Sequence, residues 1–364
     1  MYIKKLTFKN YRNLENASFE PFDGVNVIYG DNAQGKTNML EMIWLFTGGR
    51  SFRGSKDGEL IRFGEKSALI GAEFYAAGRE QTIEITINPG KRSAVQNGVA
   101  KGYMSQIIGT FCCVIFSPDH LQLIKSGPEE RRSFIDGALC QIKPQYAVML
   151  SRYRRILNER NALLKDIPRH RELIDTLDIW DEKLSFEGAK IAAERLKYMT
   201  RLSPAASGYY SGISDKREVL SLSYKSTFGA EAGMSTAEIK QQLLNSLIKR
   251  QNDDIYCGFT GSGVHRDDIA AKIDNKSARS FGSQGQQRST VLSLKLAEAQ
   301  ILGEEQNEPP VILLDDVLSE LDPKRQGYLI NKLNNRQVFI TCCEPSNQFK
   351  NIVRLSSGAI IYNK

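Results

Sequence analysis

Residues 30–37 read Gly-Asp-Asn-Ala-Gln-Gly-Lys-Thr and fit the pattern G-x-x-x-x-G-K-[ST] in full. Such a loop binds phosphate, because its glycines let backbone N–H groups close around the oxygens while the lysine neutralises β- and γ-phosphate charge. The threonine hydroxyl ligates Mg²⁺. An apolar run at 25–29 and a helical pattern at 38–46 flank the loop, as the motif requires. The expected nucleotide-binding residues of the loop are Gly30, Asp31, Asn32, Ala33, Gln34, Gly35, Lys36 and Thr37.

Two adjacent acids form the second chemical element. Residues 311–314 are typical of a short buried strand, and Asp315 and Asp316 follow it. We expect Asp315 to hold the Mg²⁺ together with Thr37, and Asp316 to polarise the attacking water. Apolar strands that end in acids are common, so Asp315 and Asp316 indicate a metal site only in combination with the glycine-rich loop. The candidate catalytic residues are Lys36, Asp315 and Asp316.

A third element lies in the roughly 280 residues between the loop and the acids. Residues 281–289 read Phe-Gly-Ser-Gln-Gly-Gln-Gln-Arg-Ser and precede a helical pattern at 290–302. A hydroxyl, backbone N–H groups and the helix dipole would there face an anion. The segment is similar to the signature motif of the ABC superfamily, which would make Ser283, Gly285 and Gln286 nucleotide contacts. Taken alone, it could equally be a polar loop that caps a helix.

The composition is that of a globular protein of two or three domains. The 364 residues are 41% hydrophobic and 25% charged, with a net charge of +7 that permits an anionic partner without requiring one. The six cysteines and three histidines show no zinc-ligand spacing. No apolar run approaches the roughly 18 residues of a membrane span. We expect a cytoplasmic protein with reduced cysteines and no membrane partner.

The pattern along the chain changes twice. Strand patterns at 3–11, 25–29 and 69–99 give way to helical periodicity at 145–166 and 171–201, followed by a Gly/Ser-rich segment at 203–214 expected to be a loop. After a short helix at 237–250, helices and strands alternate. We predict an α/β fold: an ABC-type P-loop ATPase head, with an antiparallel β subdomain, formed by residues 1–125 and 252–364. A mainly helical lobe, residues 126–251, interrupts it.

Basic residues gather at the start of the predicted lobe. Residues 131–155 contain six basic residues and one acid, a net +5. Phe134, Tyr146 and Tyr153 lie among them, so phosphates could be contacted and bases stacked. The alternative is a solvated helix face. A second basic stretch at 50–62 could bind DNA or serve structural pairing, whereas 169–201 mixes signs and is assigned no DNA role. The candidate DNA-binding residues are Arg50, Arg53, Arg131, Arg132, Arg152, Arg154 and Arg155.

Several segments together resemble one family, the RecF recombination mediators of the ABC/SMC-like ATPases. They are Asn10–Asn13, the loop with Asn32, Gly49–Arg53, Phe116–Asp119, Gly127–Asp136, Gly261–Gly263, His265–Asp267, Ser283–Arg288 and Leu314–Asp322.

The resemblance implies binding of ATP and Mg²⁺, an ATP-dependent homodimer, and binding of single-stranded, gapped or junction DNA. It also implies slow ATP hydrolysis and action with RecR and RecO to promote RecA loading and SOS induction. Arg12 would lie near the nucleotide, and Ser283 and Gln286 on the ATP of the partner subunit.

Two departures from the wider ABC pattern limit the expected turnover. Asp316 stands where a longer glutamate is usual, and Cys342-Cys343-Glu344 contains no switch histidine. A Q-loop glutamine cannot be assigned. We expect at most a weak, DNA-stimulated ATPase. The alternatives are an ATP-binding scaffold that acts through protein partners with only nonspecific DNA binding, and a transporter motor, which the long insert disfavours.

Overall fold

The computed structural model describes residues 1–344, 349 and 351–362. These residues form two compact units. We call residues 1–122 with 291–364 the head and residues 123–290 the lobe. Each unit is described by itself.

The first sheet of the head is antiparallel. Its strand order is β2 (Ala17–Phe19), β1 (Tyr2–Lys9), β4 (Ala68–Ala76), β5 (Arg79–Asn88), β6 (Lys91–Gln96) and β7 (Val99–Lys101). Burial alternates along β5, as expected for a sheet with one face in the core. Asn97 and Gly98 both adopt positive φ in the two-residue turn between β6 and β7, the conformation that matches strand twist in such hairpins.

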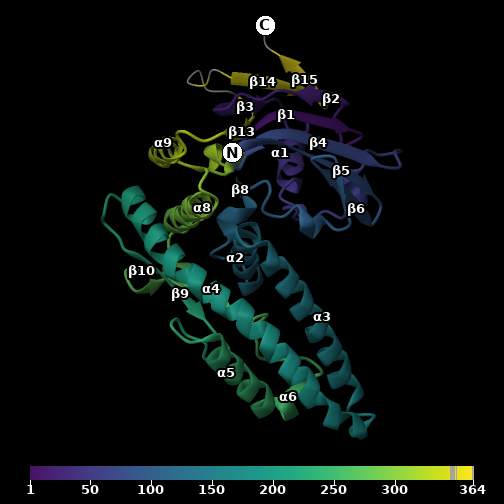
Figure 1. The fold of residues 1–364 in the computed structure, drawn as a ribbon. Helices are drawn as coiled ribbons and strands as arrows, with labels where there is room; N and C mark the ends of the chain where they lie inside the picture. Colours follow the sequence, from purple (N-terminus) through teal and green to yellow (C-terminus); the bar gives the residue numbers. More distant parts are fainter. Residues whose placement is uncertain (345–348, 350, 363–364) are drawn as a thin grey trace. The chain divides into compact units, whose positions relative to one another are not determined.

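The second sheet of the head is mostly parallel and positions the glycine-rich loop and Asp315. Its order is β15 (Ala359–Tyr362), β14 (Asn351–Ser356), β3 (Val25–Tyr29), β13 (Val338–Cys342), β12 (Val311–Asp315) and β8 (Cys113–Phe116), with only β15 antiparallel among the described strands. Helix α1 (Lys36–Leu45) packs on β12 and β13 (Figure 1). Every residue of β12 is buried, because both faces of this sheet are covered. Helix α9 spans Pro323–Lys332, and α8 (Gln284–Gln306) begins in the lobe and continues into the head.

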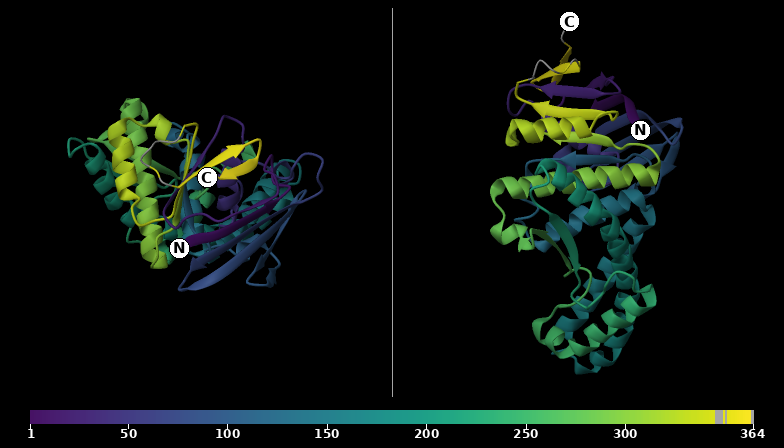
Figure 2. Two further views of the ribbon diagram at one scale, coloured as in Figure 1. Left: turned by 90° about the horizontal axis from the view of Figure 1, so that it is seen from above. Right: turned by 90° about the vertical axis from the view of Figure 1, so that its left-hand side faces the viewer.

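The lobe is mainly helical. It contains α2 (Pro128–Ile142), α3 (Pro144–Asp166), α4 (Leu177–Ile213), α5 (Thr236–Lys249), α6 (Gln251–Cys257) and α7 (Ala278–Phe281). Helix α4 packs between α3 and α5 (Figures 1 and 2). A small antiparallel sheet has the order β11 (Lys276–Ser277), β10 (Asp268–Ile273), β9 (Leu220–Lys225). Short 3₁₀ helices at Asp57–Leu60, Met104–Gln106, Asp119–Gln122, Arg171–Thr176 and Leu318–Glu320 complete the two units. Within the described residues, no helix is both long enough and apolar enough to span a membrane.

The predicted fold class is confirmed: an α/β head with an antiparallel subdomain is interrupted by a mainly helical insert. The predicted division at 251/252 and the division of the structure at 290/291 differ. The reason is strand pairing, since β10 pairs with β9 along its whole length and keeps residues 268–277 in the lobe. The segment that resembles the signature motif therefore begins in the lobe.

The prediction of a loop at 203–214 was wrong, because α4 continues through it to Ile213. Pro204 lies inside the helix and removes one backbone donor. Leu202, Ala206 and Tyr210 are fully buried on one side of this stretch. Packing of that apolar face outweighs the low helix propensity of its proline, glycine and serine residues.

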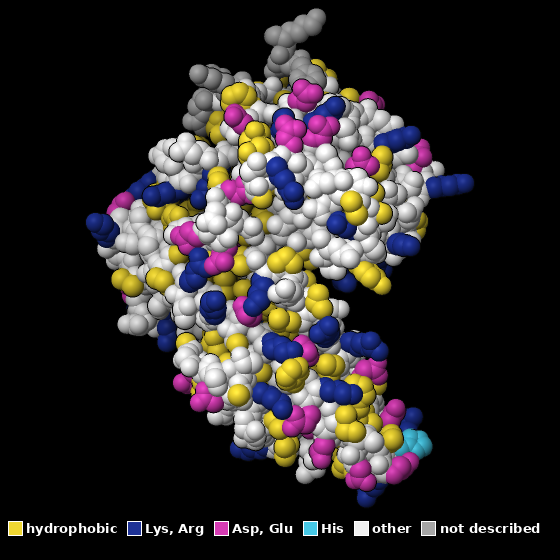
Figure 3. All heavy atoms as spheres, in the orientation of Figure 1, with side chains coloured by type: hydrophobic (Ala, Val, Ile, Leu, Met, Phe, Trp, Pro, Cys, Tyr) yellow, Lys and Arg dark blue, Asp and Glu magenta, His cyan; other side chains and the backbone are white. Residues whose placement is uncertain are grey.

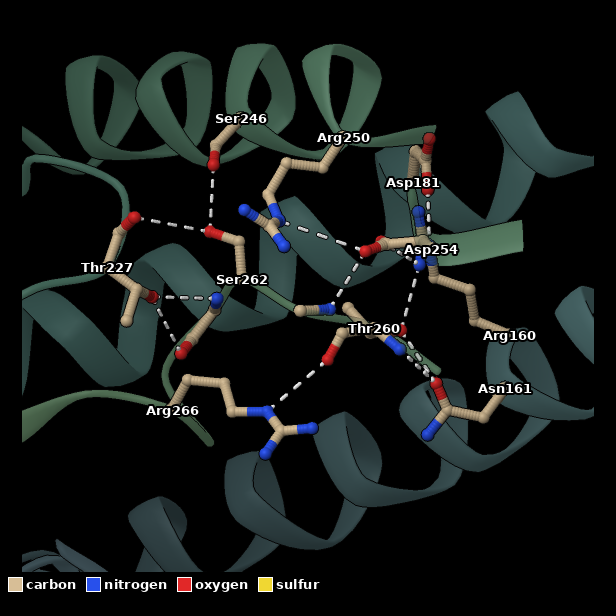
Figure 4. Close-up of polar contacts among 12 residues, drawn as sticks. Arg160, Asn161, Asp181, Thr227, Ser246, Arg250, Asp254, Thr260, Ser262 and Arg266 are labelled. Carbon is tan, nitrogen blue, oxygen red and sulfur yellow. Dashed lines mark hydrogen bonds and ion pairs between the residues drawn. The ribbon is translucent and has the colours of Figure 1, made fainter. Parts of the chain in front are cut away.

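A buried arginine joins four elements of the lobe (Figure 4). Arg160 of α3 is fully buried; its Nε donates to Asp181 of α4 at 2.6 Å, and its Nη1 donates to Asp254 of α6 at 2.9 Å. Nη1 also donates to the hydroxyl of Thr260 at 2.8 Å, while Asn161 accepts two hydrogen bonds from Thr260. This network fixes the segment after α6 against three helices.

Replacing Arg160 with Ala should destabilise the lobe by about 3–5 kcal/mol, because buried Asp181 loses its counter-ion and buried Asp254 keeps only Arg250, at 3.9 Å. Trp180 lies in the lobe and Trp44 in the head, so urea unfolding followed by Trp180 fluorescence in a Trp44→Phe background reports on the lobe. The control, Arg155→Ala, changes an exposed arginine of the same helix and should shift stability by about 0.5 kcal/mol or less. Equal urea unfolding midpoints for the two variants would contradict the proposed structural role of Arg160.

Candidate functional site

The glycine-rich loop joins β3 to α1 in a conformation that needs its glycines. Gly35 caps α1 with φ 105°, and Gly30 has φ 153°. A Cβ on Gly30 would lie 2.3 Å from the carbonyl oxygen of Leu355, and one on Gly35 would lie 2.7 Å from Oδ1 of Asn13. Neighbouring atoms fill the space beside both glycines, so the loop can adopt this backbone only without side chains there. The loop ends at the N-terminus of α1, a position that favours phosphate binding.

The side chain of Lys36 folds back onto the glycine-rich loop. Its side chain is 8% exposed, and Nζ donates to the carbonyl oxygens of Gly30 at 2.6 Å and Asp31 at 3.1 Å. The thiol of Cys343, just after β13, lies 3.7 Å from the same Nζ and donates to Asn32 Oδ1 at 3.3 Å. Neighbouring segments also hold the loop: Asn13 donates to the carbonyl of Ala33 at 3.0 Å, and the amide oxygen of Gln34 accepts from the N–H of Ser357.

Asp315 and Thr37 meet at the carboxyl edge of the parallel sheet. The Thr37 hydroxyl donates to Asp315 Oδ1 at 2.8 Å, and the Thr341 hydroxyl donates to the same oxygen at 2.9 Å. Burial raises the pKa of Asp315, opposed by these two hydrogen bonds and by the charge of Arg53. Hydroxyl and carboxylate oxygens are the hard donors that Mg²⁺ takes in nucleotide sites. The donor set therefore fits the metal that accompanies a nucleotide.

Asp316 is held beside Asp315 in a turn. Its backbone has φ 51°, a region that L-residues rarely adopt, and its N–H donates to the Thr341 hydroxyl at 2.9 Å. The Ser319 hydroxyl donates to the backbone oxygen of Asp316 at 2.7 Å. The residue is half-buried, so it keeps some access to solvent.

Arg12 lies beside α1. Its Nε and Nη2 donate to the two oxygens of Glu41 at 2.9 Å each, and Nη2 also donates to the Ser55 hydroxyl at 2.6 Å. Glu41 is fully buried in α1 and accepts two further hydrogen bonds, from Tyr11 and Ser51.

An open pocket of about 640 Å³ adjoins this arginine in the head. Arg53 lines it and donates to Asn38 of α1 at 3.0 Å. The structure thus groups Arg53, predicted to bind DNA, with the residues around the nucleotide loop. Arg50 is exposed after α1, where its carbonyl oxygen accepts from the indole of Trp44. The pocket is lined by Arg12, Asn13, Asn38, Arg53, Glu59, Ile61, Arg62, Phe63 and Ser357.

The segment that resembles the signature motif forms a capping box on α8. The Ser283 hydroxyl accepts from the N–H of Gln286 at 3.2 Å, and the amide oxygen of Gln286 accepts from the N–H of Ser283 at 2.8 Å. Gly285 lies in the first turn between them. The segment is therefore a helix cap, the geometry that also presents a helix N-terminus to an anion.

The structure argues against the prediction that Arg131 binds DNA. Arg131 is 5% exposed, and its guanidinium is bound by Asp268 at 2.7 and 2.9 Å and by three backbone carbonyls. It holds α2 against β10 and has no open edge for a phosphate. Arg132 is half-buried and donates to the carbonyl of Asp267 at 2.8 Å.

Three other basic candidates face solvent: Arg152, Arg154 and Arg155 of α3 are exposed. Figure 3 shows Lys and Arg side chains spread over one face of the lobe. The stacking prediction fails for Tyr146 and Tyr153, which are buried. Their hydroxyls bond to Asp136 at 2.6 Å and His265 at 2.7 Å.

Sequence reasoning missed three residues that contact the candidate site. Thr341, Glu41 and Cys343 contact Asp315, Arg12 and Lys36, respectively. Glu41 could have been found as the one acid in the apolar pattern of residues 39–46. Thr341 lies near the end of β13 and Cys343 just after it, and only the position of β13 between β12 and β3 reveals their contacts.

The chain matches known proteins along almost its whole length. The family model described as the RecF/RecN/SMC N terminal domain matches residues 2–359. The DNA replication and repair protein RecF of Ruminiclostridium cellulolyticum is 40% identical over 360 residues, 98% of this chain and 96% of that protein. The RecF of Bacillus cereus is 39% identical over 94% of this chain and 92% of its own length.

Solved structures agree with these matches. A structure of the recombination mediator protein RecF-ATPrS in the RecFOR pathway has a TM-score of 0.93 and 37% identity over 99% of this chain and 97% of that one. An SMC head bound to the C-terminal winged-helix domain of ScpA has a TM-score of 0.56 at 19% identity over 99% of this chain and 96% of that one, and shares the fold.

The raised pKa of Asp315 gives a pH-dependent prediction. Because the folded-state pKa lies above the unfolded one, the carboxylate destabilises the nucleotide-free protein at neutral pH, and this penalty disappears as the pH falls toward about 4. Asp315→Asn should thus raise the melting temperature at pH 7 and lose that advantage in acid. The same variant should show no added stabilisation by Mg²⁺ and ATP. A variant less stable than the parent at pH 7 would contradict the prediction.

Proposed function

Since the chain belongs to the RecF family, we propose that it is an ATP-dependent DNA-binding protein of recombinational repair and replication. ATP with Mg²⁺ binds at the glycine-rich loop and drives two copies to associate on single-stranded, gapped or junction DNA. The observation that carries the proposal is the hydrogen bond between Thr37 and Asp315, next to the glycine-rich loop and the buried Lys36. A solved structure of the recombination mediator protein RecF with ATP, in the RecFOR pathway, supports ATP as the ligand and RecR and RecO as partners. We further propose that RecA loading and SOS induction lie downstream.

Each residue of the site has a defined part in this proposal. ATP would bring the phosphoryl group and its negative charge, and Mg²⁺ would neutralise part of that charge. Lys36 and the N–H groups of the loop bind the phosphates, Thr37 and Asp315 hold the metal, and Asp316 orients the attacking water. Ser283, Gly285 and Gln286 act on the ATP of the partner subunit.

Slow hydrolysis follows from what surrounds Lys36 and Asp316. Aspartate is one methylene shorter than the glutamate usual at position 316, so its carboxylate reaches less far toward water. The thiol of Cys343 occupies the place after β13 where a switch histidine would donate to the γ-phosphate. A thiol is a weak donor, so it stabilises transferring charge less well than an imidazolium. We expect a weak ATPase stimulated by DNA.

We assign DNA binding to the exposed basic residues Arg152, Arg154 and Arg155 of α3, and keep the half-buried Arg132 of α2 as a weaker candidate. Arg50 of the head is a further candidate. Since two of the three nearby aromatic residues are buried, contacts to phosphates rather than base stacking dominate the proposed binding.

Lys36→Ala should weaken ATP binding at least about tenfold, because a charge-assisted contact to phosphate is lost. It should also abolish ATP-dependent dimerisation. A fluorescent ATP analogue measures the first effect and sedimentation velocity the second. A control, Lys332→Ala, removes a lysine of α9 outside the site. A Lys36→Ala chain that dimerised with ATP like the parent would overturn the nucleotide assignment.

Neutralising Arg152, Arg154 and Arg155 together to Gln should flatten the dependence of log K on log salt by up to about 3 units, roughly one for each lost phosphate contact. The measurement is fluorescence anisotropy with gapped, single-stranded and duplex DNA at several salt concentrations, with and without ATP.

The matched control neutralises Arg169, Arg171 and Lys197, three exposed residues of the mixed-charge segment. An equal change in slope for both triple variants would mean that net charge alone acts, and would remove the α3 surface from the proposal. Affinity that never depends on ATP would instead favour the scaffold.

A further inference from the structure

Glu218 connects the signature segment to the longest helix of the lobe. It lies in the turn between α4 and β9 and accepts one hydrogen bond on each carboxylate oxygen. Nε2 of Gln286 donates to Oε1 at 2.7 Å, and the Tyr210 hydroxyl donates to Oε2 at 2.7 Å. Tyr210 is fully buried in α4, so one end of this bridge is fixed in the core.

The side chain of Gln286 is held at both ends of its amide. Its oxygen accepts from the N–H of Ser283, and its nitrogen donates to Glu218. The amide can make both bonds only in one orientation, because oxygen accepts and nitrogen donates. Glu218 therefore selects the orientation that closes the capping box and sets the position of the Ser283 hydroxyl at the start of α8.

The turn that carries Glu218 is itself anchored to the small sheet of the lobe. The N–H of Val219 donates to Asp274 Oδ1 at 2.9 Å, and the N–H of Asp274 donates to the carbonyl of Val219 at 3.0 Å. At the start of the turn, the backbone N–H of Lys216 donates to the carbonyl oxygen of Ser211 in α4 at 2.7 Å. Glu218 is thus placed by α4 on one side and by the end of β10 on the other.

We propose that Glu218 is a positioning residue for the signature segment. By fixing Gln286, it holds Ser283 and the N-terminus of α8 in the geometry that receives the γ-phosphate of the partner subunit's ATP. This inference rests on the proposed function, because it assigns the signature segment to the partner's nucleotide. Glu218 belongs to the lobe and is not part of the glycine-rich loop, so its loss should affect association and turnover and leave ATP binding to its own chain intact.

Glu218→Ala should retain the affinity of each chain for a fluorescent ATP analogue but weaken ATP-dependent dimerisation about tenfold or more, the range for losing a hydrogen bond to a charged group. Glu218→Gln should rescue dimerisation, because its amide can accept from Gln286 and donate to the Tyr210 hydroxyl. The matched control is Glu238→Ala, which breaks the capping box of α5 in the same unit. It should dimerise like the parent, which separates this role from general weakening of the lobe.

A residue swap tests the contact itself. Gln286→Glu alone places two carboxylates against each other and should weaken dimerisation. Adding Glu218→Gln restores one donor and one acceptor, so the double variant should dimerise better than Gln286→Glu alone. Equal values for the single and double variants would show that the two side chains are not coupled.

Mixed chains separate the inference from the proposed function. Lys36→Ala has a weakened ATP site but keeps its signature segment, whereas Glu218→Ala keeps its ATP site. Mixing the two should restore ATP-dependent association, since ATP on one chain then meets an intact segment on the other.

Failure of the parent to dimerise with ATP would overturn the proposed function and the inference with it. A parent that dimerises, together with a Glu218→Ala chain that does so equally well or that mixing fails to rescue, would overturn the inference alone.

Discussion

The contact between the Thr37 hydroxyl and the Asp315 carboxylate joins residues 278 positions apart in the sequence. It exists only because β3, β13 and β12 are parallel neighbours whose carboxyl ends meet at one edge. Thr341, at the end of the middle strand, donates to the same carboxylate and so ties all three strand ends together. An insertion is tolerated between β8 and β12 because it leaves this edge unchanged. The lobe can therefore be large without disturbing the nucleotide chemistry.

The local parts of this site could be predicted from the sequence. A strand, a glycine-rich loop and a helix follow one another directly, so Lys36 and Thr37 are placed by short-range rules alone. What failed depends on tertiary structure. The Gly/Ser-rich segment at 203–214 predicts a loop, yet the buried face that includes Tyr210 keeps α4 helical. The lobe extends past residue 251 because β10 pairs with a strand over 40 residues earlier in the chain.

Helical periodicity distinguishes the buried arginines of the lobe from the exposed ones. Arg131 lies on the stripe that also contains Ile135 and Leu139, and the three are buried together. Arg160 likewise continues the buried stripe of Tyr153 and Leu164 in α3. Arg152, Arg154 and Arg155 fall off that stripe and face solvent. A count of charge along the chain cannot make this distinction, because it ignores the direction of each side chain.

Helix α4 gives the lobe an unusual mechanical property. Its 37 residues span about 55 Å, and they include both Asp181, which binds Arg160, and Tyr210, which binds Glu218. A helix of this length behaves as a stiff rod. If one end of α4 tilts, the other end is displaced in proportion to the length of the helix. Its softest point is the turn before Pro204, where a backbone hydrogen bond is missing. Bending would concentrate there, about two turns from Tyr210, and the longer part of α4 would swing as one arm.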